Sequence, residues 1–175
     1  MRTPVPQSAA LPIVHIVLRV LIVANWLMAA VILVLLFVSP NEQWIMRAFH
    51  LTPSPEASRL VMGLRAIAVV GLLAIPLHFA VLKRLLAIVE TVRAGDPFVA
   101  VNAVRLQTIA WVLLTLQVLS MLIDAIGRAV AIPGQPLDLD AGFSVNGWLA
   151  VLLTFLLARV FAEGTRMRDD LEGTV

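Results

Sequence analysis

The chain has 175 residues, of which 61% are hydrophobic and 14% charged, and its mean hydropathy is +0.97. Soluble domains are about half apolar and about a quarter charged, so this composition excludes an ordinary soluble protein and indicates an integral membrane protein. The net charge of only +2 argues against a nucleic-acid-binding surface, and the absence of cysteine excludes disulfides, thiolate metal sites and cysteine nucleophiles.

The first apolar stretch predicts a transmembrane helix over residues 12–38, after a short lead-in; residues 1–12 contain Pro4, Pro6 and Pro12. A cleaved signal peptide is the alternative. Against it, Arg19 interrupts the apolar run early, the run from Val20 to Val38 is long enough to cross a bilayer, and no small-x-small cleavage site follows. We therefore expect an uncleaved anchor that runs outward.

Residues 39–58 are more polar and predict a connection on the outer surface. Trp44, Ile45, Ala48 and Phe49 are spaced to share one face of a short helix, which is typical of an interfacial segment lying flat on the membrane. An irregular loop with two aromatic rings in the headgroup layer is the alternative.

The second transmembrane helix is predicted over residues 60–82, but its apolar stripe continues through Leu85, Val89 and Val92. We therefore expect this helix to project beyond the membrane as far as Gly95. There the sequence predicts a tight turn. Gly95 suits a left-handed helix end, Asp96 a new cap, and Pro97 a first helical position.

The third span is predicted over residues 104–126, and the proline- and glycine-rich stretch 128–143 predicts an outer loop. The fourth span is predicted over residues 145–163, followed by a charged cytoplasmic tail over 164–175. Four spans leave little chain for a separate soluble unit, so residues 1–175 are assigned to a single domain.

The distribution of cations predicts that both termini are cytoplasmic. In this topology nine cations lie inside and four outside, a clear positive-inside bias. The fold class is therefore predicted to be all-α, a compact integral membrane four-helix bundle. The inner cations are Arg2, Arg19, Lys83, Arg84, Arg93, Arg105, Arg159, Arg166 and Arg168, and the outer ones are Arg47, Arg59, Arg65 and Arg128.

Two ionisable residues inside the membrane, Arg65 and Asp124, are predicted to lie at a similar depth near the outer surface. Such groups are costly in a bilayer and need a partner or water. An antiparallel hairpin brings the two together, so we expect an intramembrane ion pair that locks the second and third helices, with a functional role as the alternative.

Other polar residues of the spans favour packing over transport. Asn25, Gly71, Gln117 and Thr154 fall near the middle of their helices, where they predict one polar layer that joins helices. A proton-coupled carrier is expected to hold an ionisable group at this depth, and none is present. Arg19 and Arg159 are expected to snorkel to the headgroups, with Glu163 as a helical neighbour of Arg159.

Sequence patterns for catalysis and metal binding are missing. His15 and His78 both belong to the inner half but differ in depth, and His50 lies on the other side, so no convergent haem or metal ligand set is predicted. Serine triads, zincin spacing, a Walker loop and a Rossmann fingerprint are absent. We therefore expect a protein that is not an enzyme and has no cofactor.

Several short blocks carry a resemblance to a known family. Residues 91–98 (TVRAGDPF), 102–106 (NAVRL), 109–111 (IAW), 160–164 (VFAEG) and 170–175 (DLEGTV) resemble the bacterial membrane proteins of the domain-of-unknown-function family 2975. The resemblance implies four membrane helices and frequent encoding beside a small helix-turn-helix regulator. It implies no established activity.

Taken together, these patterns predict a multi-pass protein of the bacterial inner membrane that presents its inner loop and tail to a cytoplasmic protein, such as a small helix-turn-helix regulator. A homo-oligomer is compatible with the pattern. The alternative is a small carrier or a lipid- or ligand-binding protein, whose cavity Arg65, Asp124 and the polar layer would line. The inner surface is predicted to comprise Arg93, Asp96, Phe98, Arg105, Arg166, Arg168, Asp169 and Asp170. The alternative is that Phe98 packs between the second and third helices and that the charges are only solvated.

Overall fold

The computed structural model of the protein describes residues 10–38, 45–47, 52–131 and 141–172. Its main elements are α1 (Ala10–Val38), α3 (Pro55–Arg93), α4 (Ala100–Val130) and α5 (Val145–Glu172). Each of these helices is long and apolar enough to cross a membrane, and the described residues contain no strand. The predicted all-α membrane fold with four spans is confirmed.

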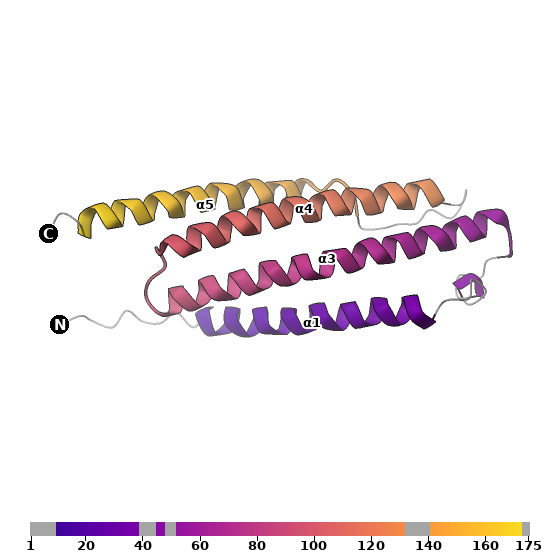
Figure 1. The fold of residues 1–175 in the computed structure, drawn as a ribbon, viewed down its shortest axis with the longest axis horizontal. Helices are drawn as coiled ribbons and strands as arrows, with labels where there is room; N and C mark the ends of the chain where they lie inside the picture. Colours follow the sequence, from indigo (N-terminus) through magenta and orange to yellow (C-terminus); the bar gives the residue numbers. More distant parts are fainter. Residues whose placement is uncertain (1–9, 39–44, 48–51, 132–140, 173–175) are drawn as a thin grey trace.

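The four helices lie side by side in the order of the chain (Figure 1). Helix α1 packs on α3, α3 on α4, and α4 on α5, and within the described ranges α1 has no contact with α4 or α5. The bundle is thus an open row and not the compact arrangement that we expected. The physical reason is that lipid solvates apolar side chains as well as protein does, so no hydrophobic force closes the row.

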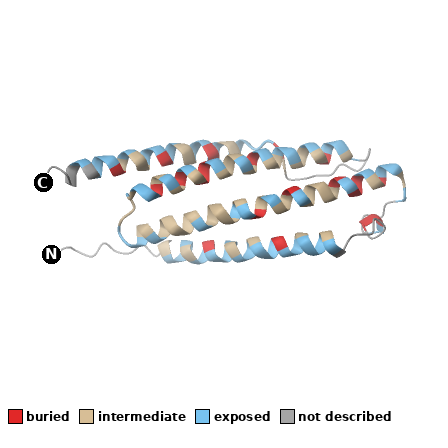
Figure 2. Cartoon of the chain, in the orientation of Figure 1, coloured by how far each residue is buried: buried red, intermediate tan, exposed pale blue. Residues whose placement is uncertain are grey.

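Apolar side chains cover the outside of the row, as expected for helices in contact with lipid. Phe37 is 80% exposed, and Met62 and Leu152 are also strongly exposed. Buried residues are sparse and lie along the helix contacts (Figure 2). Val61 and Ala110 are the clearest examples, with no exposed surface.

Helix α3 is longer than the predicted span 60–82 at both ends. Its start is set by Ser54, whose Oγ accepts a hydrogen bond of 3.1 Å from the Ala57 N–H. Pro55 occupies the first turn, where it loses no helical hydrogen bond, and Glu56 adds a negative charge at the positive end of the helix dipole. These local signals begin the helix five residues before the predicted boundary.

The C-terminal end of α3, which is its predicted inner end, has the predicted left-handed glycine. The words inner and outer name the two ends of the row after this predicted orientation. Gly95 has φ +84°, its N–H donates to Val92 O, and the Asp96 N–H donates to Thr91 O, both at 3.1 Å. This pair of bonds is a Schellman motif, which satisfies the last carbonyl groups of the helix. The expectation that the helix runs as far as Gly95 is therefore confirmed.

The next helix begins later than Pro97, so the predicted capping role of Asp96 is wrong. Val99, in an extended conformation, is the N-cap of α4 and makes no side-chain capping bond, and the helix begins at Ala100. The reason is tertiary, because the side chain of Asp96 is bound to α5 instead, as described below.

Helix register places charged residues of neighbouring helices at common heights. Arg105 contacts the Ala87 carbonyl directly. Phe155 of α5 contacts Trp111 of α4, and Phe161 of α5 contacts Phe98 of the α3–α4 turn, so Arg159, between the two phenylalanines, lies near the height of Arg105. The Trp26–Phe79 contact sets the register of α1 in the same way. From this register we infer that five cations lie within about two helical turns of one height. We call them the inner belt: Arg19, Lys83, Arg84, Arg105 and Arg159.

An outer cation level lies at the other end of the membrane layer. Gly63 faces Val130, which brings Arg65 to the height of Arg128. Arg65 and Lys83 are 18 residues apart in α3, which is about 27 Å along a helix. This distance is close to the roughly 30 Å hydrocarbon thickness of a bilayer. The two cation levels therefore match the two edges of a membrane.

The connection from α1 to α3 contains a helical turn at residues 45–47. Ile45 and Met46 are buried there against Ala57 and Val61 of α3. Ile45 therefore packs on α3, whereas an interfacial helix would direct this side chain toward the headgroups. Trp44, Ala48 and Phe49, which complete the predicted stripe, lie outside the described residues.

The connection from α4 to α5 returns into the membrane layer. Gly142 has φ +109° and is buried against Asp124, one turn inside the outer cation level. Its N–H donates to Ser120 Oγ at 3.1 Å, and its carbonyl accepts from Gln117 Nε2 at 3.3 Å. Non-helical backbone is tolerated at this depth only when its polar groups are satisfied within the protein. Gln117 and Ser120 supply those bonds.

The predicted single polar layer is not assembled. Asn25 donates from α1 to the Ile75 carbonyl of α3 at 3.2 Å, whereas Gln117 serves the connection to α5. Thr154 donates to Ala150 O in its own helix at 2.7 Å. An open row of helices separates these residues into different interfaces.

Candidate interaction surface at the α3–α4 turn

Asn102 is the centre of the α3–α4 turn. This side chain has no exposed surface, although it is polar. Its Nδ2 donates to Thr91 Oγ1 at 2.7 Å and to the Pro97 carbonyl at 2.9 Å. It thus joins the end of α3, the turn and the first turn of α4. Burying an amide without partners costs a few kcal/mol, so this satisfied arrangement holds the turn in one conformation.

Arg105 completes the network from the next turn of α4. Its Nη1 donates to Asn102 Oδ1 at 2.9 Å and to the Ala87 carbonyl at 3.2 Å. The side chain is half-buried between α3 and α4. Arg105 was predicted to belong to the inner surface, and the structure places it mainly beneath that surface, as a support of the turn.

Phe98 connects the turn to α5. Its ring lies 5.3 Å from the Phe161 ring, centroid to centroid, and packs over Gly164. A Cβ atom at position 164 would lie 3.1 Å from Phe98 Cδ1, so glycine makes room for the ring. Phe98 is still 43% exposed. The ring therefore packs on α5 with one part and remains accessible with another.

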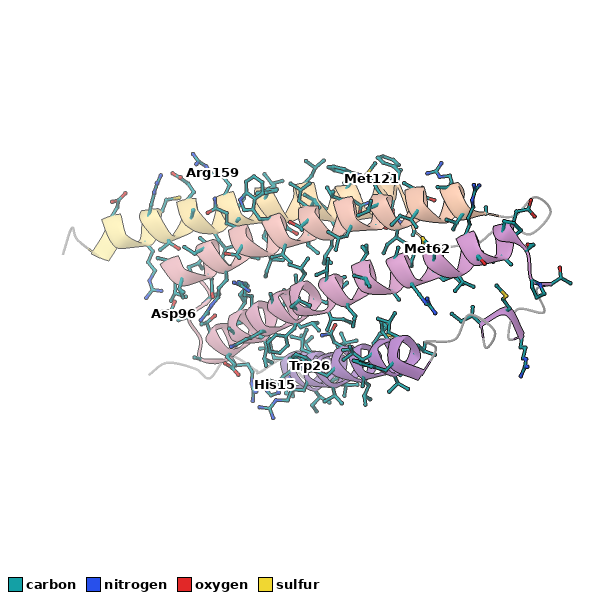
Figure 3. The ribbon with its side chains drawn as sticks, turned by 45° about the vertical axis from the view of Figure 1, so that its right-hand side comes forward. His15, Trp26, Met62, Asp96, Met121 and Arg159 are labelled. Atoms are coloured by element: carbon teal, nitrogen blue, oxygen red, sulfur yellow. The ribbon has the colours of Figure 1, made fainter. Side chains whose placement is uncertain are left out.

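Asp96, which is labelled in Figure 3, makes a second link between the turn and α5. Its Oδ1 accepts a hydrogen bond from Arg168 Nη1, in an ion pair whose two side chains remain partly exposed. Residues 72 positions apart in the chain are joined in this way. The pair and the Phe98–Phe161 contact make the turn and the end of α5 one surface.

The remaining charged residues surround these two links. Arg93 is exposed at the end of α3, and Asp170 is exposed on α5. Arg166 Nη1 lies 3.7 Å from Glu163 Oε2, so the ion pair of Glu163 is with Arg166. Arg159, for which Glu163 was the expected neighbour, is one turn away on the same helix. The side chain of Asp169 lies outside the described part of the structure. We call the following set the inner platform: Arg93, Asp96, Phe98, Arg166, Arg168 and Asp170.

The structure gives Asp124 a partner on its own helix. Its carboxylate binds Arg128, one turn further along α4. Arg65 is half-buried on α3, at the height of Arg128. The predicted Arg65–Asp124 pair stays a prediction, and the observed partner shows that Asp124 is also compensated locally.

The two described histidines serve neighbouring helices or their own helix. His15 Nε2 lies 3.9 Å from Glu90 Oε1, which links the inner ends of α1 and α3. His78 Nδ1 forms a hydrogen bond of 2.9 Å with the Ala74 carbonyl. Among the described side chains, no group of three or more His, Cys, Asp or Glu residues is placed to hold a metal ion.

Sequence reasoning did not assign a role to Asn102, Thr91, Phe161 or Gly164, which the structure brings together at the turn. A signal for the first of these was present. Asn102 and Arg105 are spaced to share one face of a helix that starts directly after a turn, and such a polar pair suits the capping of nearby carbonyls. The contact with Phe161 depends on how α5 packs, and no local pattern contains it.

Comparison with known proteins identifies the family of the chain. No curated protein and no solved structure matches it. The family described as "Protein of unknown function (DUF2975)" matches residues 41–175. The matched range contains α3, α4, α5 and every residue of the inner platform, and it begins after α1. The chain therefore belongs to the DUF2975 family of proteins of unknown function.

Proposed function

We propose that this protein is a non-enzymatic component of the bacterial inner membrane whose inner platform binds a cytoplasmic protein, such as a small helix-turn-helix regulator. The observation that carries the proposal is the joining of the α3–α4 turn to α5 through Asp96–Arg168 and Phe98–Phe161. A part-exposed aromatic ring surrounded by charges of both signs is a common anchor for a protein partner.

The lengths of two helices support a role outside the membrane. Helix α3 continues ten residues beyond Lys83, to Arg93, which is about 15 Å. Helix α5 continues thirteen residues beyond Arg159, to Glu172, which is about 20 Å. Both distances are sufficient to cross the headgroup layer, so the inner platform is accessible from water.

The orientation is part of the proposal. The beginning of α1, the α3–α4 turn and the end of α5 lie at one end of the row (Figure 1). The belt of Arg19, Lys83, Arg84, Arg105 and Arg159 also lies toward that end, and the positive-inside rule assigns such an end to the cytoplasm. Cysteine introduced at position 95 should resist an impermeant thiol reagent added to intact cells, and labelling from outside would reverse the assignment.

The carrier alternative receives no support from the positions of its residues. Asn25 and Gln117, which it requires to line one path, lie in different helix interfaces. Asp124 is paired with Arg128 at the outer end.

Affinity capture from detergent-solubilised membranes, with the captured proteins identified by mass spectrometry, tests the platform. We expect a DNA-binding regulator to be enriched with the wild-type chain. Phe98→Ala and deletion of residues 166–175 should each lower its recovery at least about tenfold, because aromatic anchors dominate binding energy in interfaces. Phe143→Ala is the matched control, since Phe143 is an exposed phenylalanine in the α4–α5 connection, away from the inner platform.

Two results would contradict the proposal. One is the absence of any enriched DNA-binding protein with the wild-type chain. The other is equal recovery from Phe98→Ala and Phe143→Ala when both variants unfold at the wild-type temperature.

A further inference from the structure

A groove of about 490 Å³ lies between the inner halves of α4 and α5. Its volume is within the range of small-molecule sites. Small side chains explain why the two helices leave this space: Ala100 and Ala103 line it from α4, and Ala158 and Ala162 line it from α5. Helix spacing is set elsewhere by larger contacts, such as Trp111 on Phe155 and Phe98 on Phe161. The groove is thus held open from both ends.

The charge of the groove is positive. Arg159 and Arg166 line the α5 side, two helical turns apart on one face, and Gln107 adds an amide from α4. Arg159 is exposed (Figure 3), and within the described part of the chain it has neither an ion-pair nor a hydrogen-bond partner. Arg166 has Glu163 at 3.7 Å as its counter-charge. One uncompensated cation therefore faces the groove.

The depth of the groove is that of the headgroup layer. Arg159 lies at the inner belt, where the hydrocarbon ends, and Phe155 lies one turn deeper. Arg166 lies seven residues beyond Arg159, and hence about 10 Å further from the membrane centre. A groove at this level offers an apolar floor to an acyl chain and a cation to a phosphate group.

From this combination we propose that the groove is a binding site for an anionic phospholipid. The lipid phosphate lies against Arg159, and the headgroup extends toward Arg166 and Gln107. The first part of an acyl chain follows Val104 and Phe155 into the bilayer. The inference is independent of the proposed cytoplasmic partner and of which leaflet faces the cytoplasm, because it depends only on depth, shape and charge.

Native mass spectrometry of the purified full-length protein tests the site, with phosphatidylglycerol and phosphatidylcholine of identical acyl chains added at equal concentrations. The wild-type protein should retain phosphatidylglycerol preferentially. Arg159→Gln should weaken this binding about five- to tenfold, as expected for the loss of one cation near a lipid phosphate. Ala162→Trp should fill the groove and abolish it.

Two matched controls separate the groove from general attraction to lipid. Arg19→Gln removes an arginine at the same depth on α1, where the hollow beside it is formed by Val20, Val23, Ala24 and Leu27. Val160→Trp places the same indole side chain on an exposed part of α5 outside the groove. Both variants should bind phosphatidylglycerol like the wild type.

Four outcomes would overturn the proposal. The first is equal binding of the two lipids, and the second is equal weakening by Arg159→Gln and Arg19→Gln. The third is displacement of the lipid by glycerol phosphate at comparable concentration, which would make a free phosphate compound the ligand. The fourth is a dimer that Ala162→Trp dissociates, which would make a second copy of the chain the occupant.

Discussion

The α3–α4 turn and the α4–α5 connection both have to satisfy polar groups outside the helices, and they do so in opposite ways. Each contains a glycine with positive φ, +84° at Gly95 and +109° at Gly142, and each is held by polar side chains of α4. At the inner turn the buried side chain of Asn102 donates hydrogen bonds to the Thr91 hydroxyl and the Pro97 carbonyl. At the outer connection the backbone of Gly142 is buried, and the side chains of Ser120 and Gln117 form hydrogen bonds with it.

Their different positions relative to the membrane account for this difference. The inner turn lies beyond the cation belt, where water satisfies any remaining polar groups, and Gly95 has no side-chain neighbour within 4 Å of a potential Cβ. The outer connection returns into the membrane layer, where an unsatisfied peptide group costs several kcal/mol. The inner turn can therefore leave Phe98 and its charges exposed for recognition, whereas the outer connection has to be closed.

The largest effect is expected from Asn102→Leu. The substitution removes the three hydrogen bonds of the buried Asn102 side chain and leaves Thr91, Pro97 and Arg105 with one partner fewer each, so the free energy of unfolding should fall by about 3 kcal/mol. Titration with a denaturing detergent in mixed micelles measures it. Asn146→Leu is the control, because Asn146 is exposed. Equal losses in the two variants would show that the Asn102 network does not stabilise the turn.

Gly142→Ala should be the next most damaging change, at about 2 kcal/mol. It adds the cost of a left-handed alanine to a contact of 2.9 Å between the new Cβ and the Asp124 carboxylate. The same detergent titration measures the loss. Shortening Asp124 to alanine in the Gly142→Ala background should recover part of it. If it recovers none, the contact does not contribute.

Gly95→Ala sharpens the comparison, because it is the same substitution in a turn with open space. Only the cost of the left-handed backbone conformation applies, so the free energy of unfolding should fall by about 1 kcal/mol. A value as large as that of Gly142→Ala would mean that the inner turn is packed as closely as the outer connection, which would contradict an accessible platform.

The smallest effect is expected at Asp96 and Arg168. Their ion pair is partly exposed, so its coupling energy in a double-mutant cycle with Asp96→Asn and Arg168→Gln should be about 0.5 kcal/mol, and it should decrease with added salt. A coupling of several kcal/mol would instead make the pair a structural lock.

Local patterns predicted much of the fold. The apolar runs indicated four spans, and the spacing of Leu85, Val89 and Val92 predicted the extension of α3 to Gly95. The helix-start signal of Ser54, Pro55 and Glu56 is also local, although the predicted span of residues 60–82 does not include it. The prediction that Asp96 caps the next helix was wrong because it rested on residue type alone, whereas the side chain is bound to Arg168.

By itself, the sequence determined that this is a four-helix membrane protein with a left-handed turn at Gly95, since hydropathy, helix period and glycine chemistry act over short distances in the chain. Only the tertiary structure decided that the helices form an open row, that Asn102 lies at the centre of the turn, and that the turn joins α5. Those features depend on the register between helices, because contacts such as Phe98–Phe161 and Asp96–Arg168 join residues far apart in the chain.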